Sequence, residues 1–414
     1  MAGKVVVLGG GGGVGSVAAR ALAQTDDADE VVVVDLSAEA AAATVAEIAD
    51  PRFRAEGVDI TDDAAFTALV DGAAVVLNCV GPFYRFGAPT LAKCIAAGVT
   101  YVDVCDDLSA TRAQLDLDGD AKAAGVQALI GMGNSPGLAN IFVKMCAEMF
   151  LDEVHTADIM HIHGGEPDEG AAVIKHRVWA MVNDVPLFVD GEFVEVRMLE
   201  DSARPFISDE EFIGLEGTYP VFPYPHPEVI TLPPVFPTLR RATNLGVIFP
   251  LPYFTMTQDL VAAGMGSEEP LTVGGAEVAP IDVMVALLQR ERPRLLAEAG
   301  VTGPGGALKV VVGGLKDGDE HTYVCTVNSE GAGAGEGTGI PAALGAILAL
   351  RGAIGGGPGV HPPEAAVDVT ALLELAGSVV ARMGVGDGSG VPLTLEHLGP
   401  DGTREVVPFG IGAA

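Results

Sequence analysis

The sequence predicts an α/β protein: a doubly wound domain of the Rossmann type, followed by a second α/β domain with a mostly antiparallel sheet. Short apolar runs alternate with helical segments over the first third of the 414 residues, as in βαβ units. A glycine-rich loop directly follows the first of these runs. After residue 150 the strands instead alternate between apolar and polar residues, which is typical of antiparallel sheets.

In the first domain, each short apolar run is expected to form a strand of a parallel sheet, because such strands are buried on both faces. The expected strands are residues 5–8, 31–34, 58–60, 75–77, 100–104 and 127–130. The expected helices between them are residues 16–24, 38–48, 64–70 and 89–97.

The second domain is expected to begin with a helix at residues 138–150 and an alternating strand at 156–163. Residues 206–252 are rich in proline and aromatic residues, which predicts a long, stiffened loop system. Later elements are expected as an antiparallel pair at 309–313 and 322–327, a glycine-rich stretch at 331–339 and a helix at 340–350. We divide the chain into residues 1–135, completed by about 336–414, and residues 136–335.

Composition and charge restrict the classes of partner. Acidic residues outnumber basic ones 56 to 23, giving a net charge of −33, so nucleic acid and membrane surfaces are poor partners. The five cysteines form no C-x-x-C pair, which argues against a disulfide framework or a zinc site and fits a reducing compartment. No signal peptide precedes the first strand, and the apolar residues 340–350 are too few to span a bilayer. We expect a soluble, cytoplasmic protein without a metal.

The strongest motif is the loop after the first strand. Gly10, Gly12 and Gly15 match G-x-G-x-x-G, and Gly13 and Val14 lie within the same segment. The glycines permit a tight turn, close approach to a pyrophosphate and close packing of helix on strand, and the helix N-terminus favours phosphate. The strand–loop–helix context predicts a site for NAD, with NADP as the alternative.

Two acidic residues border this loop. Asp35 ends the second strand, twenty residues after Gly15, where a carboxylate accepts hydrogen bonds from the ribose hydroxyls of NAD and repels the 2′-phosphate of NADP. Asp59 is a second candidate, either at the adenine or as the cap of a turn, and we favour the cap.

The segments after the fourth and fifth strands would reach the same crevice, because the carboxyl ends of the strands face it. Asn78, Gly81 and Pro82 are expected beside the nicotinamide ribose, and Tyr84 and Arg85 beside the substrate. In residues 103–107, Asp106 is the candidate for proton transfer or for an ammonium, while Asp106 or Asp107 could equally cap the next helix. Residues 131–140 place small residues and a proline between a strand and a helix, which also suggests close approach of the backbone to a ligand.

Together these segments resemble the saccharopine dehydrogenase-like family, which includes saccharopine reductase, lysine 6-dehydrogenase and carboxynorspermidine dehydrogenase. The matching segments are the glycine loop and residues 78–83, 101–103, 135–140, 226–228, 231–233, 338–341 and 359–364. The resemblance implies a Rossmann domain, an α/β substrate and dimerisation domain, a homodimer, and hydride transfer at a C–N bond of an amino acid or imine. Saccharopine reductases have Asp where this chain has Ser135, before Pro136 and Gly137. The resemblance therefore leans toward lysine 6-dehydrogenase.

In the second domain, His161 and His163 alternate along a strand and so share one face, where either could act as a general base; we take His163 as the catalytic candidate. Lys175, His176 and Arg177 follow on an expected helix, where a cation could hold a substrate carboxylate.

Three functions remain in competition. The first is an NAD(P)-dependent oxidoreductase acting on CH–NH or CH–NH₂ groups. The second uses the same scaffold to reduce a larger imine or an enoyl substrate in a roomy pocket lined by the aromatic residues of 222–254. The third is an NAD-binding sensor without catalysis.

Overall fold

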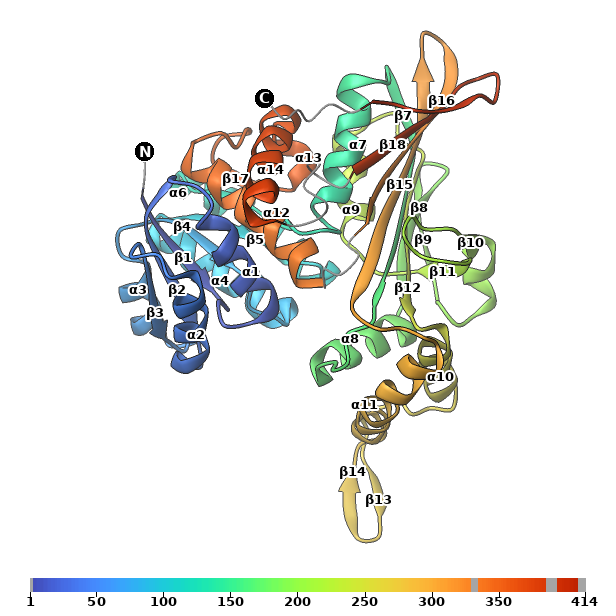
Figure 1. The fold of residues 1–414 in the computed structure, drawn as a ribbon, viewed down its shortest axis with the longest axis horizontal. Helices are drawn as coiled ribbons and strands as arrows, with labels where there is room; N and C mark the ends of the chain where they lie inside the picture. Colours follow the sequence, from blue (N-terminus) through green and yellow to red (C-terminus); the bar gives the residue numbers. More distant parts are fainter. Residues whose placement is uncertain (1–2, 329–333, 385–392, 409–414) are drawn as a thin grey trace.

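The computed structural model describes residues 3–328, 334–384 and 393–408, which form two large sheets with helices around them (Figure 1). The first sheet has the strand order β17-β6-β5-β4-β1-β2-β3, and all its neighbours pair in parallel. The second has the order β10-β11-β12-β7-β15-β16-β18-β19, with β8 and β9 attached to β12. Its described strands pair antiparallel except β7 with β12. The predicted fold class is confirmed.

The first sheet is built from the N-terminal third of the chain, with β17 added from the C-terminal part. Its strands are β1 (Gly3–Leu8), β2 (Ala28–Asp35), β3 (Phe53–Gly57), β4 (Ala73–Asn78), β5 (Thr100–Asp103), β6 (Gln127–Leu129) and β17 (Gly359–His361). Its helices are α1 (Gly13–Leu22), α2 (Ala38–Ile48), α3 (Asp63–Val70), α4 (Phe83–Ala97), α5 (Leu108–Leu115) and α6 (Asp118–Ala124).

Two predicted elements of this half were misplaced. The third strand was expected at residues 58–60, but β3 lies at Phe53–Gly57, because buried Phe53 pairs with Val31 and Asp59 closes a turn. The helix expected at 89–97 begins at Phe83, with Pro82 at its N-cap and Pro89 tolerated on its exposed side. Local propensity around Pro89 had argued for a break there.

The second sheet is built mainly from the middle of the chain. Its strands are β7 (Glu153–Gly164), β8 (Val185–Val189), β9 (Glu192–Val196), β10 (Ser208–Glu210), β11 (Tyr219–Pro223), β12 (Arg241–Phe249), β15 (Gly305–Lys316), β16 (Asp319–Asn328), β18 (Leu393–Leu398) and β19 (Arg404–Val406). The other elements are α7 (Leu138–Met149), α8 (Ala171–Val182), the 3₁₀ helix η1 (Asp201–Phe206), α9 (Glu228–Val235), α10 (Leu251–Ala262), α11 (Pro280–Glu298) and the hairpin β13 (Leu271–Val273) and β14 (Ala276–Val278).

The prediction of a long loop system at residues 206–252 was wrong. This segment contains β10, β11, α9 and β12. All of β12 except Arg241 is buried, and the strand pairs with both β7 and β11, so tertiary pairing overrides the weak local pattern. The long strand predicted at 156–163 and the pair predicted at 309–313 and 322–327 are confirmed as β7, β15 and β16.

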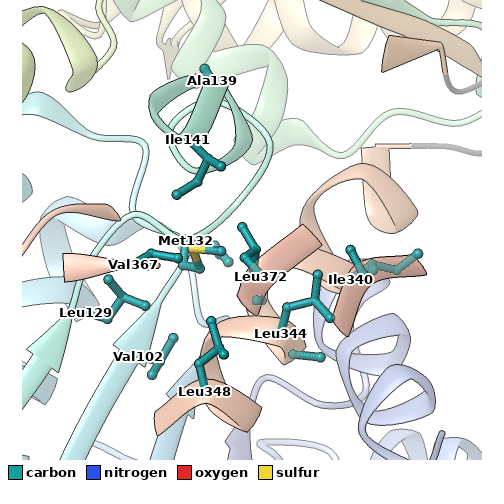
Figure 2. Close-up of a cluster of buried hydrophobic side chains, with 14 of the residues drawn as sticks. Val102, Leu129, Met132, Ala139, Ile141, Ile340, Leu344, Leu348, Val367 and Leu372 are labelled. Atoms are coloured by element: carbon teal, nitrogen blue, oxygen red, sulfur yellow. The ribbon is translucent and has the colours of Figure 1, made fainter. Parts of the chain in front are cut away.

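The C-terminal helices α12 (Ala334–Leu350), α13 (Pro363–Ala366) and α14 (Val369–Met383) return to the first sheet (Figure 1). Figure 2 shows Leu344, Leu348 and Leu372 packed toward Val102 of β5 and Leu129 of β6. The same cluster includes residues of the segment after β6 and of α7. This buried contact joins the C-terminal part of the chain to the first sheet.

Glycines allow α12 to lie close against α1. A Cβ atom on Gly339 would stand 2.6 Å from the carbonyl oxygen of Val14, so a larger residue could not fit there. The remaining part of the predicted completion, 393–406, instead extends the second sheet, because β18 pairs with the edge of β16 and buries Leu395. The domain boundaries themselves stay a prediction.

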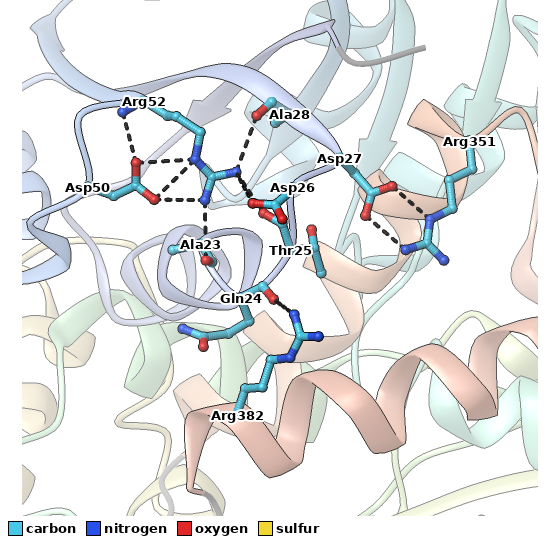
Figure 3. A network of polar contacts seen from close by, with 10 residues as sticks. All are labelled: Ala23, Gln24, Thr25, Asp26, Asp27, Ala28, Asp50, Arg52, Arg351 and Arg382. Carbon is cyan, nitrogen blue, oxygen red and sulfur yellow. Dashed lines mark hydrogen bonds and ion pairs between the residues drawn. The ribbon is translucent and has the colours of Figure 1, made fainter. Parts of the chain in front are cut away.

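Polar contacts also hold the C-terminal helices to the turn between α1 and β2 (Figure 3). Arg351, after α12, makes two 2.9 Å hydrogen bonds to the carboxylate of Asp27, and Arg382 of α14 donates to the carbonyl of Gln24. Arg351 and Arg382 are both partly exposed, and exposed ion pairs contribute only ~0–1 kcal/mol. The apolar cluster of Figure 2 therefore contributes most of the attachment. No helix in the described part of the chain is long and apolar enough to cross a membrane.

Replacing Leu372 by alanine should lower the free energy of unfolding by about 2–5 kcal/mol, because its fully buried side chain would leave a cavity between α14 and the first sheet. Urea unfolding followed by circular dichroism measures the change. Leu271→Ala is the control: this side chain is 59% exposed on the β13–β14 hairpin and should cost less than about 0.5 kcal/mol. Equal effects of the two changes would contradict the packing described for α14.

Candidate functional site

The glycine loop after β1 has the geometry of a phosphate-binding turn. The backbone N–H of Gly10 donates to Val34 at 2.8 Å, and a Cβ atom on Gly15 would lie 2.2 Å from the Gly9 carbonyl oxygen. By contrast, a Cβ on Gly13 would meet open space. Helix α1 begins after Gly12 without a side-chain cap and without an acidic residue in its first turn. Its first N–H groups and positive dipole end therefore fit a pyrophosphate.

Asp35 lies beside this loop at the end of β2. Its Oδ2 accepts a hydrogen bond from the Gly11 N–H at 3.0 Å, and its Oδ1 accepts one from the Ser37 N–H at 3.2 Å. Residues 36–41 contain no lysine or arginine that would pair with a 2′-phosphate. The carboxylate is thus held at the edge of the loop, where it fits the ribose hydroxyls of NAD.

Asp59 has the turn-capping role of the two predicted for it. Its exposed carboxylate accepts hydrogen bonds from the N–H of Thr61 at 2.9 Å and from its hydroxyl at 2.7 Å, and these bonds lower the pKa of Asp59. A contact with adenine stays a prediction.

The segment after β4 is fixed by a buried hydrogen-bond chain. Asn78 donates to the hydroxyl of Tyr101 at 2.9 Å, and Tyr101 donates to Asp103 at 2.8 Å. The side-chain oxygen of Asn78 accepts from the Val80 N–H at 3.0 Å, which sets the path toward Gly81 and Pro82. This path runs beside the glycine loop, since a Cβ on Gly9 would lie 3.0 Å from the carbonyl oxygen of Cys79.

Tyr84 and Arg85 follow at the start of α4 and point largely to solvent. Tyr84 is 66% exposed, and the Arg85 guanidinium lies over the ring of Phe86, 5.0 Å from its centroid. In the described residues, no contact links this pair to Asp106 or His163. Their role beside the substrate stays a prediction.

The acidic residues after β5 have separate roles. Buried Asp103 accepts from the N–H groups of Cys105 at 3.1 Å and Gly131 at 2.8 Å, and so holds two loops together. Asp107 caps α5 by accepting from the Ala110 N–H at 2.8 Å. Asp106 makes neither kind of contact and is only half-buried. Burial raises its pKa, and a protonated His176 would act in the opposite direction. The choice left open between Asp106 and Asp107 is resolved, because Asp107 is the cap.

Four of the eight histidines gather around β7, α8 and the segment before α9, and one of them, His176, acts on Asp106. His161 and His163 share a face of β7, as predicted, with ring centroids 6.2 Å apart. His226 stacks on His161 at 5.0 Å, and Tyr224 meets His161 edge-on at 5.3 Å. Burial lowers the pKa of His161 to about 3 and also lowers the pKa values of His163 and His226. These three imidazoles are therefore neutral at pH 7.

Ser135 connects the loop after β6 to this group. Its hydroxyl donates to the Oε1 of Glu228, accepts from the Nδ2 of Asn244 at 3.0 Å, and lies 3.3 Å from the Nδ1 of His226. The side-chain oxygen of Asn244 is 3.1 Å from the Nε2 of His161. Glu228 is fully buried, and burial raises its pKa to about 7.

A second charged group lies at the other end of the histidines. Arg177 of α8 and Arg292 of α11 are each only 1% exposed, and both pair with Glu169. Burial would raise the pKa of Glu169, but the charge of Arg177 and its hydrogen bonds outweigh that effect and lower it. Arg177 Nε has no hydrogen-bond partner. Lys175, the third cation considered on this helix, pairs with Asp282 at 2.7 Å and faces away from this group.

From the predicted set, His163 lies beside His161, and Asp106 acts on the pKa of Tyr224. Around them the structure adds residues for which no chemical role was predicted: Ser135, Tyr224, His226, Glu228 and Asn244. One signal was present in the sequence. The polar residue Asn244 directly precedes the apolar run 245–249, and a polar residue that such a strand buries needs a partner. Among the described residues, no group of three or more His, Cys, Asp or Glu is arranged to hold a metal ion.

Comparison with known proteins agrees with this geometry. Residues 5–129 match the saccharopine dehydrogenase NADP-binding domain. The chain is 26% identical over 374 residues to a carboxyaminopropylagmatine dehydrogenase of Synechocystis, covering 84% of this chain and 89% of the relative. It is 25% identical over 382 residues to a carboxynorspermidine synthase of Vibrio alginolyticus, covering 83% and 88%.

Among solved structures, the apo saccharopine dehydrogenase (L-Glu forming) of Saccharomyces cerevisiae has the same fold. The TM-score is 0.65 at 15% identity, covering 95% of this chain and 99% of that one.

The fold and the nucleotide loop together define an NAD(P)-dependent oxidoreductase with a Rossmann domain. More specifically, residues 5–129 match the saccharopine dehydrogenase NADP-binding domain, and over most of its length the chain is similar to oxidoreductases that act on CH–NH type groups. The resemblance predicted from the motifs is confirmed. The leaning toward lysine 6-dehydrogenase is not supported, because the two relatives that cover most of the chain are named for carboxylated polyamines.

Replacing Asp35 by alanine should weaken NAD binding roughly tenfold or more, because hydrogen bonds to a charged acceptor are each worth about 1.5–3 kcal/mol. NADP should lose little or gain, since the repulsion of its 2′-phosphate also disappears. Calorimetric titration with each cofactor measures both effects. Asp59→Ala is the matched control and should leave the NAD-to-NADP ratio unchanged. Equal weakening of both cofactors by Asp35→Ala would remove Asp35 from the ribose site.

Proposed function

We propose that this protein transfers hydride between a nicotinamide cofactor and the C–N bond of a carboxylated polyamine. The substrate class is a secondary amine, or the corresponding imine, that carries a carboxylate near one end and a second cationic group near the other. The two relatives that span most of the chain are named for compounds of this class, carboxyaminopropylagmatine and carboxynorspermidine.

The observation that carries this proposal is an acidic group without lysine or arginine partners. Within the described residues, neither Asp106 nor Glu228 pairs with a lysine or arginine, and the imidazole of His226 beside Glu228 is neutral. The charges of Asp106 and Glu364 both raise the pKa of Glu228, so each of them lies close enough to Glu228 to repel its negative charge. A bound ammonium would relieve this repulsion, which favours a polyamine over a neutral substrate.

A cation for the carboxylate lies on the other side of Tyr224. Burial raises the pKa of Tyr224 to about 12. The positive charge of Arg177 lowers this pKa and the negative charge of Asp106 raises it, so Tyr224 lies near both groups. Arg177 has a spare N–H donor in Nε. The site therefore has an anionic and a cationic end, as an amino-carboxylate substrate requires.

The first domain supplies the cofactor site in this proposal. Residues 10–15 would bind the pyrophosphate, and Asp35 would bind the adenosine ribose. Asn78, Gly81 and Pro82 would lie beside the nicotinamide half of the cofactor. When bound, the nicotinamide supplies hydride chemistry. Asp35 favours NAD, although the matching family is named for NADP, because nothing basic follows Asp35 within residues 36–41.

Absorbance of the reduced nicotinamide tests the proposal directly. Carboxynorspermidine and carboxyaminopropylagmatine should reduce NAD, and NADP more slowly, whereas lysine should not. Turnover of lysine or saccharopine alone would overturn the substrate class. No turnover of any compound, together with tight NADH binding, would favour the non-catalytic sensor. Turnover of an enoyl substrate alone would favour the reductase alternative.

Replacing Asp106 by asparagine should raise KM for the carboxylated polyamine about tenfold to hundredfold, because a charged hydrogen bond to the ammonium is lost. The fold should be unaffected, since Asp106 makes no cap or loop contact. The neighbouring change Asp107→Asn is the control: it weakens the α5 cap and should lower the melting temperature with little effect on KM. An unchanged KM in Asp106→Asn would contradict the ammonium assignment.

A further inference from the structure

The hydrogen bonds of Ser135 determine that its hydroxyl proton points to Glu228. The side-chain oxygen of Asn244 faces His161, so the amide nitrogen of Asn244 faces Ser135 and donates to it at 3.0 Å. With that lone pair occupied, the hydroxyl of Ser135 directs its own proton to the Oε1 of Glu228. Ser135 is half-buried, while Glu228 behind it is fully buried.

Glu228 is suited to hold a proton close to neutral pH. Its Oε1 receives hydrogen bonds from Ser135 and from Asn244 at 3.3 Å, whereas its Oε2 has none and lies 3.9 Å from the Nδ1 of His226. The charged groups that face it are carboxyls, Asp106 after β5 and Glu364 of α13. The groups around His226 are the imidazoles of His161, His163 and His176. The positive charge of Lys144 of α7 lowers the pKa of Glu364.

The position of Ser135 also matters. It follows β6 at the carboxyl edge of the parallel sheet, where cofactors and substrates bind in doubly wound folds. Asp106 follows the neighbouring strand β5 at the same edge. A substrate nitrogen attracted by Asp106 would therefore come to the exposed side of the Ser135 hydroxyl.

We propose that Ser135 relays the proton between the substrate nitrogen and Glu228. This inference rests on the proposed function. In amine oxidation, the secondary ammonium gives a proton to Ser135 Oγ while Ser135 gives its own proton to the carboxylate of Glu228. The neutral amine formed in this way is the species from which a bound oxidised nicotinamide would accept hydride, and the product would be an iminium ion. One proton is stored on Glu228 for each hydride transferred, and imine reduction runs the same steps in reverse.

A purely structural contact between the two domains would not need a carboxyl at this point. A neutral amide at position 228 would accept the same hydrogen bonds without the electrostatic cost of a buried charge near Asp106 and Glu364. The relay and the structural contact therefore make different predictions for the effect of pH.

The test is the pH dependence of kcat in both directions, with carboxynorspermidine for oxidation and the matching imine for reduction. Oxidation needs ionised Glu228, so its kcat should rise with pH through about 7. Reduction needs protonated Glu228, so its kcat should fall over the same range. Glu228→Gln should abolish both the rise of kcat with pH in oxidation and its fall in reduction. It should also lower kcat about 10²–10⁴-fold, as loss of general acid–base catalysis does. Ser135→Ala should do the same, and Ser135→Thr should restore much of the rate.

Glu364→Gln is the matched control. Glu364 is a second buried glutamate, bonded to Asn140 at 2.8 Å and not to Ser135. Its charge raises the pKa of Glu228, so its removal should shift the pH dependence of kcat to lower pH in both directions without abolishing it.

A measurement without substrate is also available. The folded-state pKa of Glu228 lies above the ordinary value of 4.5, so the folded protein binds the extra proton between these values and loses stability as pH rises through about 7. The melting temperature of Glu228→Gln relative to the wild type should therefore increase across that range.

The outcomes separate the two proposals. If the wild-type protein does not turn over carboxylated polyamines, the proposed function is overturned, and the relay with it. The relay alone is overturned if Glu228→Gln keeps the wild-type pH dependence of kcat, or if Ser135→Ala keeps full activity. A melting-temperature difference that does not vary with pH overturns Glu228 as the proton store, whatever the activity.

Discussion

The arrangement of the site depends on one buried carboxylate, Asp103 at the end of β5. Its hydrogen bonds to Cys105 and Gly131 hold the loops after β5 and β6, and Tyr101 extends the same network to Asn78 after β4. Burial raises the pKa of Asp103 while its four hydrogen-bond donors lower it, so the group is costly to bury and is retained because it orders three loops at once. Asp106 and Ser135 are placed by those loops.

Charge is divided in the same way between the two halves of the molecule. The first domain provides backbone N–H groups and the dipole of α1 for an anionic cofactor, whereas the acidic residues facing the second sheet would repel such a group. For the proposed cationic substrate, electrostatics would therefore direct the cofactor and the substrate to different parts of the protein before any specific contact forms. Tyr224 lies near both Asp106 and Arg177, and the paired arginines are bound to Glu169 and not to Asp106 or Glu228 in the described part of the chain.

Sequence reasoning identified the elements whose physical cause is local. The loop of Gly10, Gly12 and Gly15 needs glycine for steric reasons that a short motif records, and the alternation at His161 and His163 fixes a shared face. The contact of Ser135 with Glu228 could not be predicted, because it joins residues 93 positions apart and depends on how β12 pairs with β7. The proline-rich segment was misread for the same reason, since β12 is a strand only because its neighbours make it one.

The path of the chain has a consequence for how the protein is made. The chain crosses from the first sheet to the second between β6 and β7, returns before α12, and crosses again between α14 and β18. Neither half is a continuous stretch, so β17 and β18, which complete the two sheets, are synthesised only after the middle of the chain. At about 5–20 residues per second, the nascent chain must keep the apolar face later covered by α12 and α14 exposed for many seconds. The first sheet therefore cannot bury this face until α12 and α14 have been made.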